Sequence, residues 1–128
     1  MSRRDARDVA FKLIFSYNFD KLKNMDALQE YTFEMDSDDK AYVEEVYNGV
    51  ISHYDSLIEE ISKHAEKFEV SRIFKVDLTV LLLAIYEIKF MQDIPFKVSV
   101  DEAINLAKKY STEKSGKYIN GILAKFAR

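Results

Sequence analysis

The sequence of 128 residues contains no cysteine, one proline and three glycines. Without cysteine there is no disulfide framework, no zinc–thiolate site and no thiol nucleophile. Because proline and glycine are scarce and no stretch alternates apolar and polar residues as a strand does, the sequence predicts helices. Long apolar runs are lacking too. The longest, residues 80–86, falls far short of the roughly 20 residues that cross a bilayer.

The first residues also lack a targeting signal, since they contain no apolar core followed by a small-residue cleavage site. The absence of thiols fits a reducing compartment, and a chain of this length can bury a core without staples. We therefore expect a soluble, cytoplasmic protein that forms one domain over residues 1–128 and does not associate with a membrane.

Residues suited to catalysis are few. His53 and His64 are the only histidines, and on one helix a spacing of eleven residues separates them by about 16 Å, too far to share a metal ion. The acidic pairs at 44–45 and 59–60 are adjacent in sequence, so their side chains diverge. The chain has no glycine-rich phosphate loop and no nucleophile elbow. We expect surface histidines, no enzyme activity, no catalytic residue, no metal and no cofactor.

Charge is unevenly distributed along the chain, whose net charge is −3. Residues 1–12 carry +2 and residues 108–128 carry +5, so the stretch between them carries −10. If the two ends meet in the fold, they form one positive patch on an acidic protein. Such a patch suits a polyanion.

Helix starts are marked at two places. Ser2 with Asp5 predicts an N-cap and an acidic capping box for the first helix, and Ser99 with Glu102 predicts a second capping box, with Val98 as its hydrophobic staple. Further helices are predicted from the spacing of apolar residues, over about 27–31, 37 or 38 to 65, 77–91, 99–110 and 115–127. The segment 77–91 is apolar nearly all round, which predicts a buried central helix. The fold class is all-α, a bundle of about six or seven helices.

The first helix offers a candidate binding face. A strip about 80° wide on this helix, at 3.6 residues per turn, holds Arg4, Arg7, Phe11 and Phe15, and it is flanked by Arg3 and Lys12. Guanidinium groups bind phosphates, and exposed rings are stacking platforms for bases. The alternative is that the rings complete a wide core face and the arginines only solubilise the helix.

The last helix carries a second candidate face, formed by Lys114, Lys117, Tyr118, Gly121 and Lys125. The alternative is a lysine-rich solvent face favoured by the C-terminal end of the helix dipole. A glycine within a helix costs about 1 kcal/mol relative to alanine. Gly121 therefore favours close approach by another molecule.

Several runs of the sequence resemble the NusB family. They are the arginine-rich start over residues 3–7 with Ala10 and Phe15, then Gly49-Val50, Tyr86-Glu87 followed by Ile94-Pro95, and the runs 98–108 and 117–123. In this order they cover almost the whole chain, with the weakest match over residues 20–38. The resemblance implies two packed three-helix subdomains. It also implies a transcription antitermination factor that binds boxA-type single-stranded RNA together with the ribosomal protein NusE, within the RNA polymerase antitermination complex, notably on ribosomal RNA operons.

Functional residues follow from the two faces and the resemblance together. The candidate RNA-binding residues are Arg3, Arg4, Arg7, Lys12, Lys114, Lys117 and Tyr118. The resemblance implies that Asp77 faces NusE; from the residues alone, an N-cap role is the alternative. Two positions depart from the family pattern: Asp5 interrupts the arginine cluster, and Leu82 stands where many relatives carry arginine.

Two other functions stay open. A NusB-like domain also forms the N-terminal part of some ribosomal RNA cytosine methyltransferases. Because this chain ends at residue 128 without a cofactor-binding half, it could be a detached RNA-binding module of that kind. The second alternative is a structural bundle that self-associates through an apolar face, and a homodimer is a further partner that the resemblance allows.

Overall fold

The computed structural model describes residues 2–65 and 70–127. Within them the chain forms helices and no strand: α1 (Arg3–Asp20), α2 (Met25–Thr32), α3 (Ser37–Ser52), α4 (Tyr54–His64), α5 (Lys75–Phe90), α6 (Phe96–Tyr110) and α7 (Glu113–Leu123), with short 3₁₀ turns at Val70–Arg72 and Ala124–Phe126. The predicted all-α class is confirmed. None of these helices combines the length and the apolar character that crossing a membrane requires.

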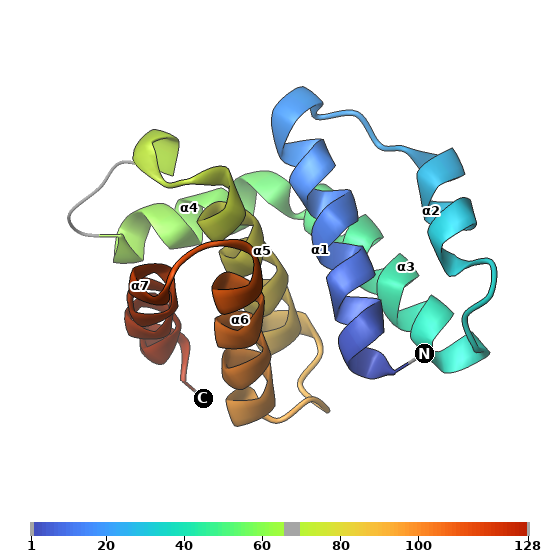
Figure 1. Cartoon of the computed structure of the whole chain (residues 1–128). Coiled ribbons are helices and arrows are strands. Elements are labelled where there is room, and N and C mark those ends of the chain that lie inside the picture. The colour runs from blue at the N-terminus through green and yellow to red at the C-terminus, as the bar shows by residue number, and fades with distance from the viewer. Residues whose placement is uncertain (1, 66–69, 128) are drawn as a thin grey trace.

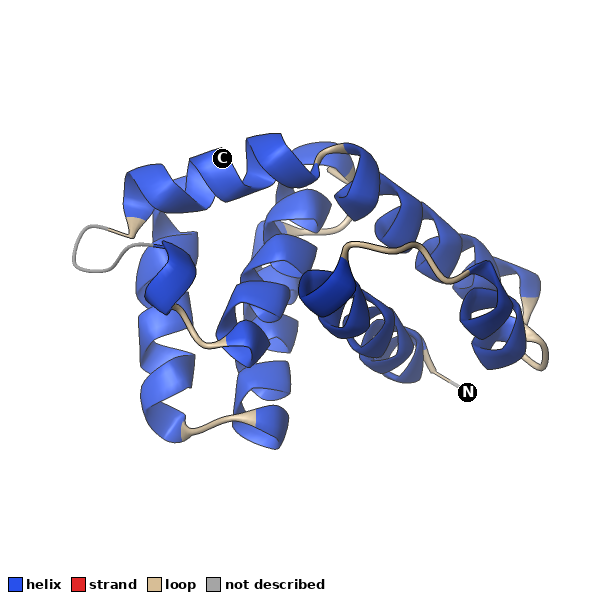
Figure 2. Cartoon of the chain, turned by 90° about the horizontal axis from the view of Figure 1, so that it is seen from above, coloured by secondary structure: helices blue, strands red, loops and turns tan. Residues whose placement is uncertain are grey.

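The helices form two groups that meet at α5. Figures 1 and 2 show α1, α2 and α3 on one side of the molecule and α4, α6 and α7 on the other. Helix α5 contacts α1, α3, α4, α6 and α7, and every residue from Asp77 to Ile88 is buried. The prediction of a buried central helix is confirmed.

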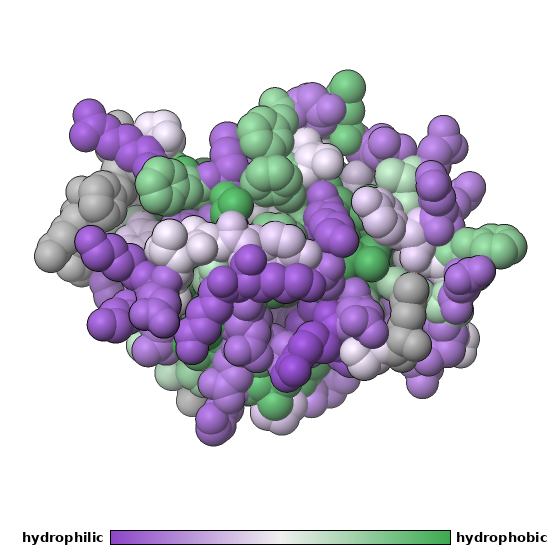
Figure 3. All heavy atoms as spheres, viewed as in Figure 1, coloured by the Kyte–Doolittle hydropathy of each residue, from purple (hydrophilic) through white to green (hydrophobic). Residues whose placement is uncertain are grey.

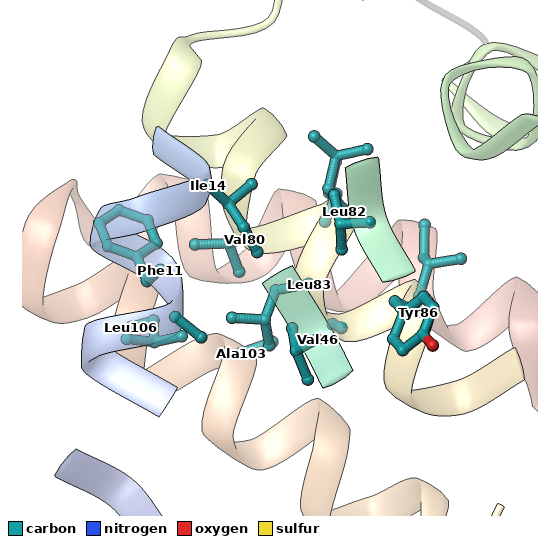
Figure 4. Packing of buried hydrophobic residues seen from close by; sticks show 14 of the residues in the cluster. Phe11, Ile14, Val46, Val80, Leu82, Leu83, Tyr86, Ala103 and Leu106 are labelled. Carbon is teal, nitrogen blue, oxygen red and sulfur yellow. The ribbon is translucent and has the colours of Figure 1, made fainter. Parts of the chain in front are cut away.

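The core is built from the apolar faces of these helices. Figure 4 shows Phe11 and Ile14 of α1, Val46 of α3 and Leu106 of α6 gathered around Leu83 of α5. Each of these five side chains is at most 6% exposed. Burying a leucine or phenylalanine side chain contributes roughly 1.5–3 kcal/mol, so this cluster holds the two groups of helices together.

Helix α1 begins as the sequence predicts. The hydroxyl of Ser2 accepts a hydrogen bond from the backbone N–H of Asp5, and the Asp5 carboxylate accepts one from the N–H of Ser2 at 2.8 Å. This reciprocal pair satisfies amides that the first helical turn leaves without partners. The helix ends at Asp20, and its C-cap Lys21 has a left-handed backbone (φ 59°) that turns the chain away.

The predicted long helix over residues 37–65 is wrong, because the chain breaks at His53 into α3 and α4. The backbone of His53 leaves helical geometry (ψ 17°), although its N–H still donates to the carbonyl of Gly49. Helix α3 packs on α1 and α5, whereas α4 packs on α5. The apolar spacing runs on through the break, since Val50 and Leu57 are both buried, so periodicity alone did not reveal it.

The predicted capping box at Ser99 is also wrong. Helix α6 begins one turn earlier, after Pro95, whose carbonyl accepts from the N–H of Ser99 at 3.2 Å. The hydroxyl of Ser99 is inside the molecule and donates to Glu87, while Glu102 pairs with Arg4. Proline fixes a backbone angle suited to a helix start. The helix therefore begins after Pro95 and not at the predicted N-cap Ser99.

Helix α7 likewise begins before the predicted Ser115. Thr112 is its N-cap, and its hydroxyl accepts from the N–H of Ser115 at 3.2 Å. The α-helix ends at Leu123, and one 3₁₀ turn continues to Phe126. Gly121 therefore lies in the last turn of α7, where nothing stands within 4 Å of the position that a Cβ would take.

Candidate nucleic-acid interface

Glu87 of α5 is fully buried and binds three polar side chains. Arg7 of α1 donates through Nε to Oε2 at 2.9 Å and through Nη2 to Oε1 at 3.3 Å. Ser99 of α6 donates to Oε1 at 2.8 Å, and the hydroxyl of Tyr42 of α3 donates to Oε2. One carboxylate thereby connects three helices to the central one.

This arrangement corrects the expectation for Arg7. Its side chain is 6% exposed, so it does not lie on the open face that the helical strip predicted. Burial lowers the pKa of Arg7, but the hydrogen bonds and charge of Glu87 outweigh burial and raise that pKa above its ordinary value. The guanidinium has its partner inside the protein, and the pair joins α1 to α5.

Arg3 and Arg4 lie nearer the surface. The guanidinium of Arg4, whose side chain is 71% exposed, donates to both carboxylate oxygens of Glu102 on α6, at 2.8 and 3.1 Å. Arg3 donates to Asp39 of α3 at 3.0 Å and lies over the ring of Tyr42. Both arginines are paired but accessible, so a phosphate could compete with their carboxylates.

Asp8 of α1 collects two lysines and a tyrosine. Lys109 of α6 and Lys12 approach it at 2.8 and 3.3 Å, and the hydroxyl of Tyr110 donates to it at 2.6 Å. Burial raises the pKa of Asp8, but its hydrogen bonds with Lys109, Tyr110 and Lys12 outweigh burial and lower that pKa below its ordinary range. Two lysine side chains are thus held at the surface where α1 meets α6.

The two phenylalanines of the α1 strip have different surroundings. Phe11 is 3% exposed and stacks on Tyr110 with ring centroids 4.7 Å apart. Phe15 is half-buried, between Phe11 and Phe19. The alternative of a wide core face holds for Phe11, and Phe15 lies at the edge of that face.

Helix α7 presents its lysines openly. Lys114 and Lys117 are exposed and have no ion pair among the residues that the structure describes. Tyr118 is half-buried beside them, and burial, with a smaller effect of the nearby Asp77 charge, raises its pKa. An aromatic ring next to two unpaired cations is an arrangement that single-stranded RNA can use.

Asp77 is not an N-cap, because α5 begins at Lys75 and Phe74 holds the cap position. Its side chain is 5% exposed, and Ser115 of α7 donates to its Oδ2 at 3.0 Å. Burial raises the pKa of Asp77 above its ordinary range. The residue borders a surface hollow of about 500 Å³, together with Phe74 and Tyr118.

The two basic ends of the sequence meet at the end of α6, where Lys109 and Tyr110 bind Asp8 of α1. Because α6 lies between α1 and α7 (Figure 1), Lys108 and Lys109 in its last turn continue the positive charge from one helix to the other. Figure 3 shows hydrophilic side chains spread over α6 and α7 on this face. Both lysines belong to the basic C-terminal segment of the sequence, although neither was predicted as a site residue.

Histidines and carboxylates form no second site in the described ranges 2–65 and 70–127, where no group of three or more His, Cys, Asp or Glu could hold a metal ion. His53 is exposed and stacks on Phe90 with ring centroids 4.4 Å apart. His64 is half-buried with its ring edge against Phe126.

Comparison with known proteins now identifies the family. The sequence model of the NusB family matches residues 4–128. The chain belongs to the NusB family. A transcription antitermination protein NusB from Natranaerobius thermophilus is 42% identical, over 99% of this chain and 95% of the relative. The NusB from Clostridium novyi is 38% identical, over 96% of each chain.

Solved NusB structures have the same fold. NusB from T. maritima superposes with a TM-score of 0.90 at 36% identity, covering 99% of this chain and 91% of that one. A crystal structure of the antitermination factors NusB and NusE in complex with double-stranded RNA matches with a TM-score of 0.86, covering 97% and 94%. At 24% identity, this second likeness concerns the fold alone.

Proposed function

We propose that this NusB-family protein is a transcription antitermination factor that binds boxA RNA together with NusE and helps RNA polymerase read through terminators, notably in ribosomal RNA operons. The observation that carries the proposal is the family match over residues 4–128, with relatives named as antitermination proteins at 38–42% identity. A protein of the same fold has been crystallised with NusE and RNA, which supports the same pair of ligands for this chain.

The RNA is proposed to cross α1, the end of α6 and α7. Its contacts would come from Arg3, Arg4, Lys12, Lys114, Lys117 and Tyr118. The lysines of α7 have no carboxylate partner in the described residues, so phosphate replaces only counterions there. On α1, phosphate must displace a carboxylate from each cation, and we therefore assign the larger share of the RNA affinity to α7.

NusE is proposed to bind next to this surface, at the start of α5. Asp77 is the acidic residue assigned to that contact, and a basic side chain of NusE could reach it through the hollow beside Phe74. Because the carboxylate is buried and Ser115 binds only one of its oxygens, a cation there would gain a strong, poorly screened interaction.

In this proposal the whole chain, residues 1–128, serves as one RNA-binding domain in the cytoplasm, where its RNA and NusE are made. It acts by binding alone, without a cofactor. The relatives are regulatory proteins, and the polar cluster at Glu87 is fully buried, out of reach of any substrate.

Titration of labelled boxA RNA with the protein, with and without NusE, tests the proposal. We expect binding that NusE strengthens and that a scrambled RNA of equal length lacks. Asp77→Asn should weaken the NusE-dependent part and leave binding by the isolated protein unchanged. Equal affinity for both RNAs with NusE present would contradict the proposal, and RNA binding indifferent to NusE would favour the detached methyltransferase module.

A further inference from the structure

Helix α2 and its flanks hold most of the large apolar side chains that the described residues expose. Five of eight lie between residues 19 and 33: Phe19, Leu22, Met25, Tyr31 and Phe33, the last of them 83% exposed. Figure 3 shows hydrophobic atoms on the surface above the C-terminal end of α1 and at the outer edge of α2. Exposed apolar side chains that gather in one region mark candidate interaction sites.

The helix itself is lightly packed. Of its eight residues only Leu28 and Thr32 are buried, and it contacts only α1 and α3 to any extent. A surface hollow of about 560 Å³ lies on its outer side, lined by Ala27, Glu30, Tyr31, Phe33 and Glu34. Aromatic rings and carboxylates therefore border the same hollow.

The charge around this hollow is negative. Residues 20–38 contain six acidic and two basic side chains, so the stretch carries −4. Asp26, Glu30 and Glu34 are spaced four residues apart and exposed, and none of them has a hydrogen bond or ion pair within the described part of the chain. RNA and anionic lipid would be repelled here. The figures also show α2 on the far side of α1 from α6 and α7. Only Tyr31 reaches back toward α1, where it borders a hollow that Lys12 also lines.

We propose that this α2 surface, defined by Tyr31, Phe33, Glu30 and Glu34, docks a basic segment of a second protein partner, distinct from NusE. The segment would place one large apolar side chain between the two rings and would set lysine or arginine against the two glutamates. Aromatic anchors of this kind dominate interface energies, and the acidic rim steers a basic partner and excludes the polyanion that α7 attracts. The inference rests on the proposed antitermination function, because the partner belongs to that complex.

Two variants of the full-length chain test the proposal: Phe33→Ser, and the double charge reversal Glu30→Lys with Glu34→Lys. The matched control is Glu59→Lys, which changes an exposed carboxylate of α4 that has no ion pair with any residue described by the structure. Read-through of a terminator is measured in an extract of the source bacterium depleted of this protein. Both variants should need roughly tenfold more protein for half-maximal read-through, as expected for loss of an interface anchor. Affinities for boxA RNA and NusE, and the unfolding midpoint, should match those of the control.

A photo-crosslinking amino acid at position 33 supplies a second readout in the same extract. In the otherwise wild-type chain, this crosslinker should form an adduct with one basic protein other than NusE. The adduct should be absent when the chain also carries Glu30→Lys and Glu34→Lys. Unchanged read-through, no adduct, loss of NusE or RNA binding, or a changed monomer–dimer equilibrium would each overturn the docking proposal. If the wild-type chain restores no read-through, the antitermination function is contradicted instead. The crosslinking result would then still show whether the α2 surface binds a basic protein.

Discussion

Glu87 shows how one residue can organise this fold. Its carboxylate has no contact with water, and its two oxygens are occupied by Arg7, Tyr42 and Ser99 from three different helices. Removing one member of a buried charged pair leaves the other charge without compensation, which costs about 3–5 kcal/mol. We therefore expect substitutions in this cluster to destabilise the protein far more than substitutions of Arg3 or Arg4, the more exposed arginines of α1.

The first prediction compares Arg7 with Arg4. Arg7→Ala should lower the free energy of unfolding by about 3–5 kcal/mol because it leaves Glu87 buried without its ion pair. Arg4→Ala, which removes an exposed pair with Glu102, should leave stability nearly unchanged but weaken RNA binding. Urea denaturation and RNA titration of both variants measure this. If Arg7→Ala were as stable as Arg4→Ala, the burial of the Arg7–Glu87 pair would be refuted.

The second prediction concerns two glycines with opposite surroundings. A Cβ at Gly49 would overlap the ring of Tyr86, which is itself 7% exposed, whereas a Cβ at Gly121 would meet only open space. Gly49→Ala should therefore destabilise the protein by about 1–3 kcal/mol through overpacking. Gly121→Ala should stabilise it by up to about 1 kcal/mol through helix propensity, yet weaken RNA binding if RNA approaches this backbone. Thermal unfolding should show midpoint shifts of opposite sign, and shifts of equal sign would contradict this packing.

At the scale of the elements, the sequence predicted the helices well and their ends less well. The apolar pattern located all the long helices and the buried α5, because burial requires that pattern. The pattern did not reveal the break at His53, since buried residues continue at helical spacing on both sides of it. Ser99 carried the signal of an N-cap, but Pro95 starts the helix and the serine hydroxyl serves Glu87.

The exposure of the candidate site residues was predicted to a similar degree, while their binding role stays a prediction. Helical spacing placed Arg4 and Arg7 on one strip, and this was right as geometry. Spacing within one helix cannot reveal a carboxylate 80 residues away, so the burial of Arg7 against Glu87 was missed. The exposure of the α7 lysines could be predicted from the sequence of α7 alone, because they lie on the face opposite a clear apolar stripe.

The contact between α1 and α6 provides a pH-dependent prediction. The folded protein lowers the pKa of Asp8 and of Glu102, mainly through Lys109, Tyr110 and Lys12 for the first and Arg4 for the second. A carboxyl whose pKa is lower in the folded state stabilises the fold when ionised. Its contribution is therefore complete above about pH 5, just above the ordinary pKa range of such groups. The contribution disappears as the pH falls through the lowered pKa values.

Asp8→Asn with Glu102→Gln should therefore flatten the acid limb of the stability–pH curve below pH 4. Urea denaturation across that range measures the slope for the wild type and the double variant. Asp101→Asn, which removes an exposed carboxylate paired with Lys97 within α6, is the control. An acid limb as steep in the double variant as in the wild type would show that these carboxylates do not hold α1 against α6.

The whole molecule separates its charges in space. The basic N-terminal half of α1, the end of α6 and the open face of α7 lie along one side, while the acidic α2 lies beyond α1 (Figure 1). An acidic protein with a net charge of −3 can bind a polyanion only if its cations are gathered in this way. In the proposed function, RNA binds the basic side and basic protein segments bind the acidic regions elsewhere.

The most direct test of the central claim is the salt dependence of boxA RNA binding, with NusE present, for the wild type and for Lys117→Ala. Each phosphate neutralised on a single strand contributes about 0.7 to the slope of log K against log salt. We predict a steep slope for the wild type and a slope smaller by about 0.7 for Lys117→Ala, with Lys97→Ala, an exposed lysine at the start of α6, unchanged. Binding that does not weaken with salt, or a Lys117→Ala variant that keeps both the wild-type affinity and slope, would contradict an RNA surface on α7.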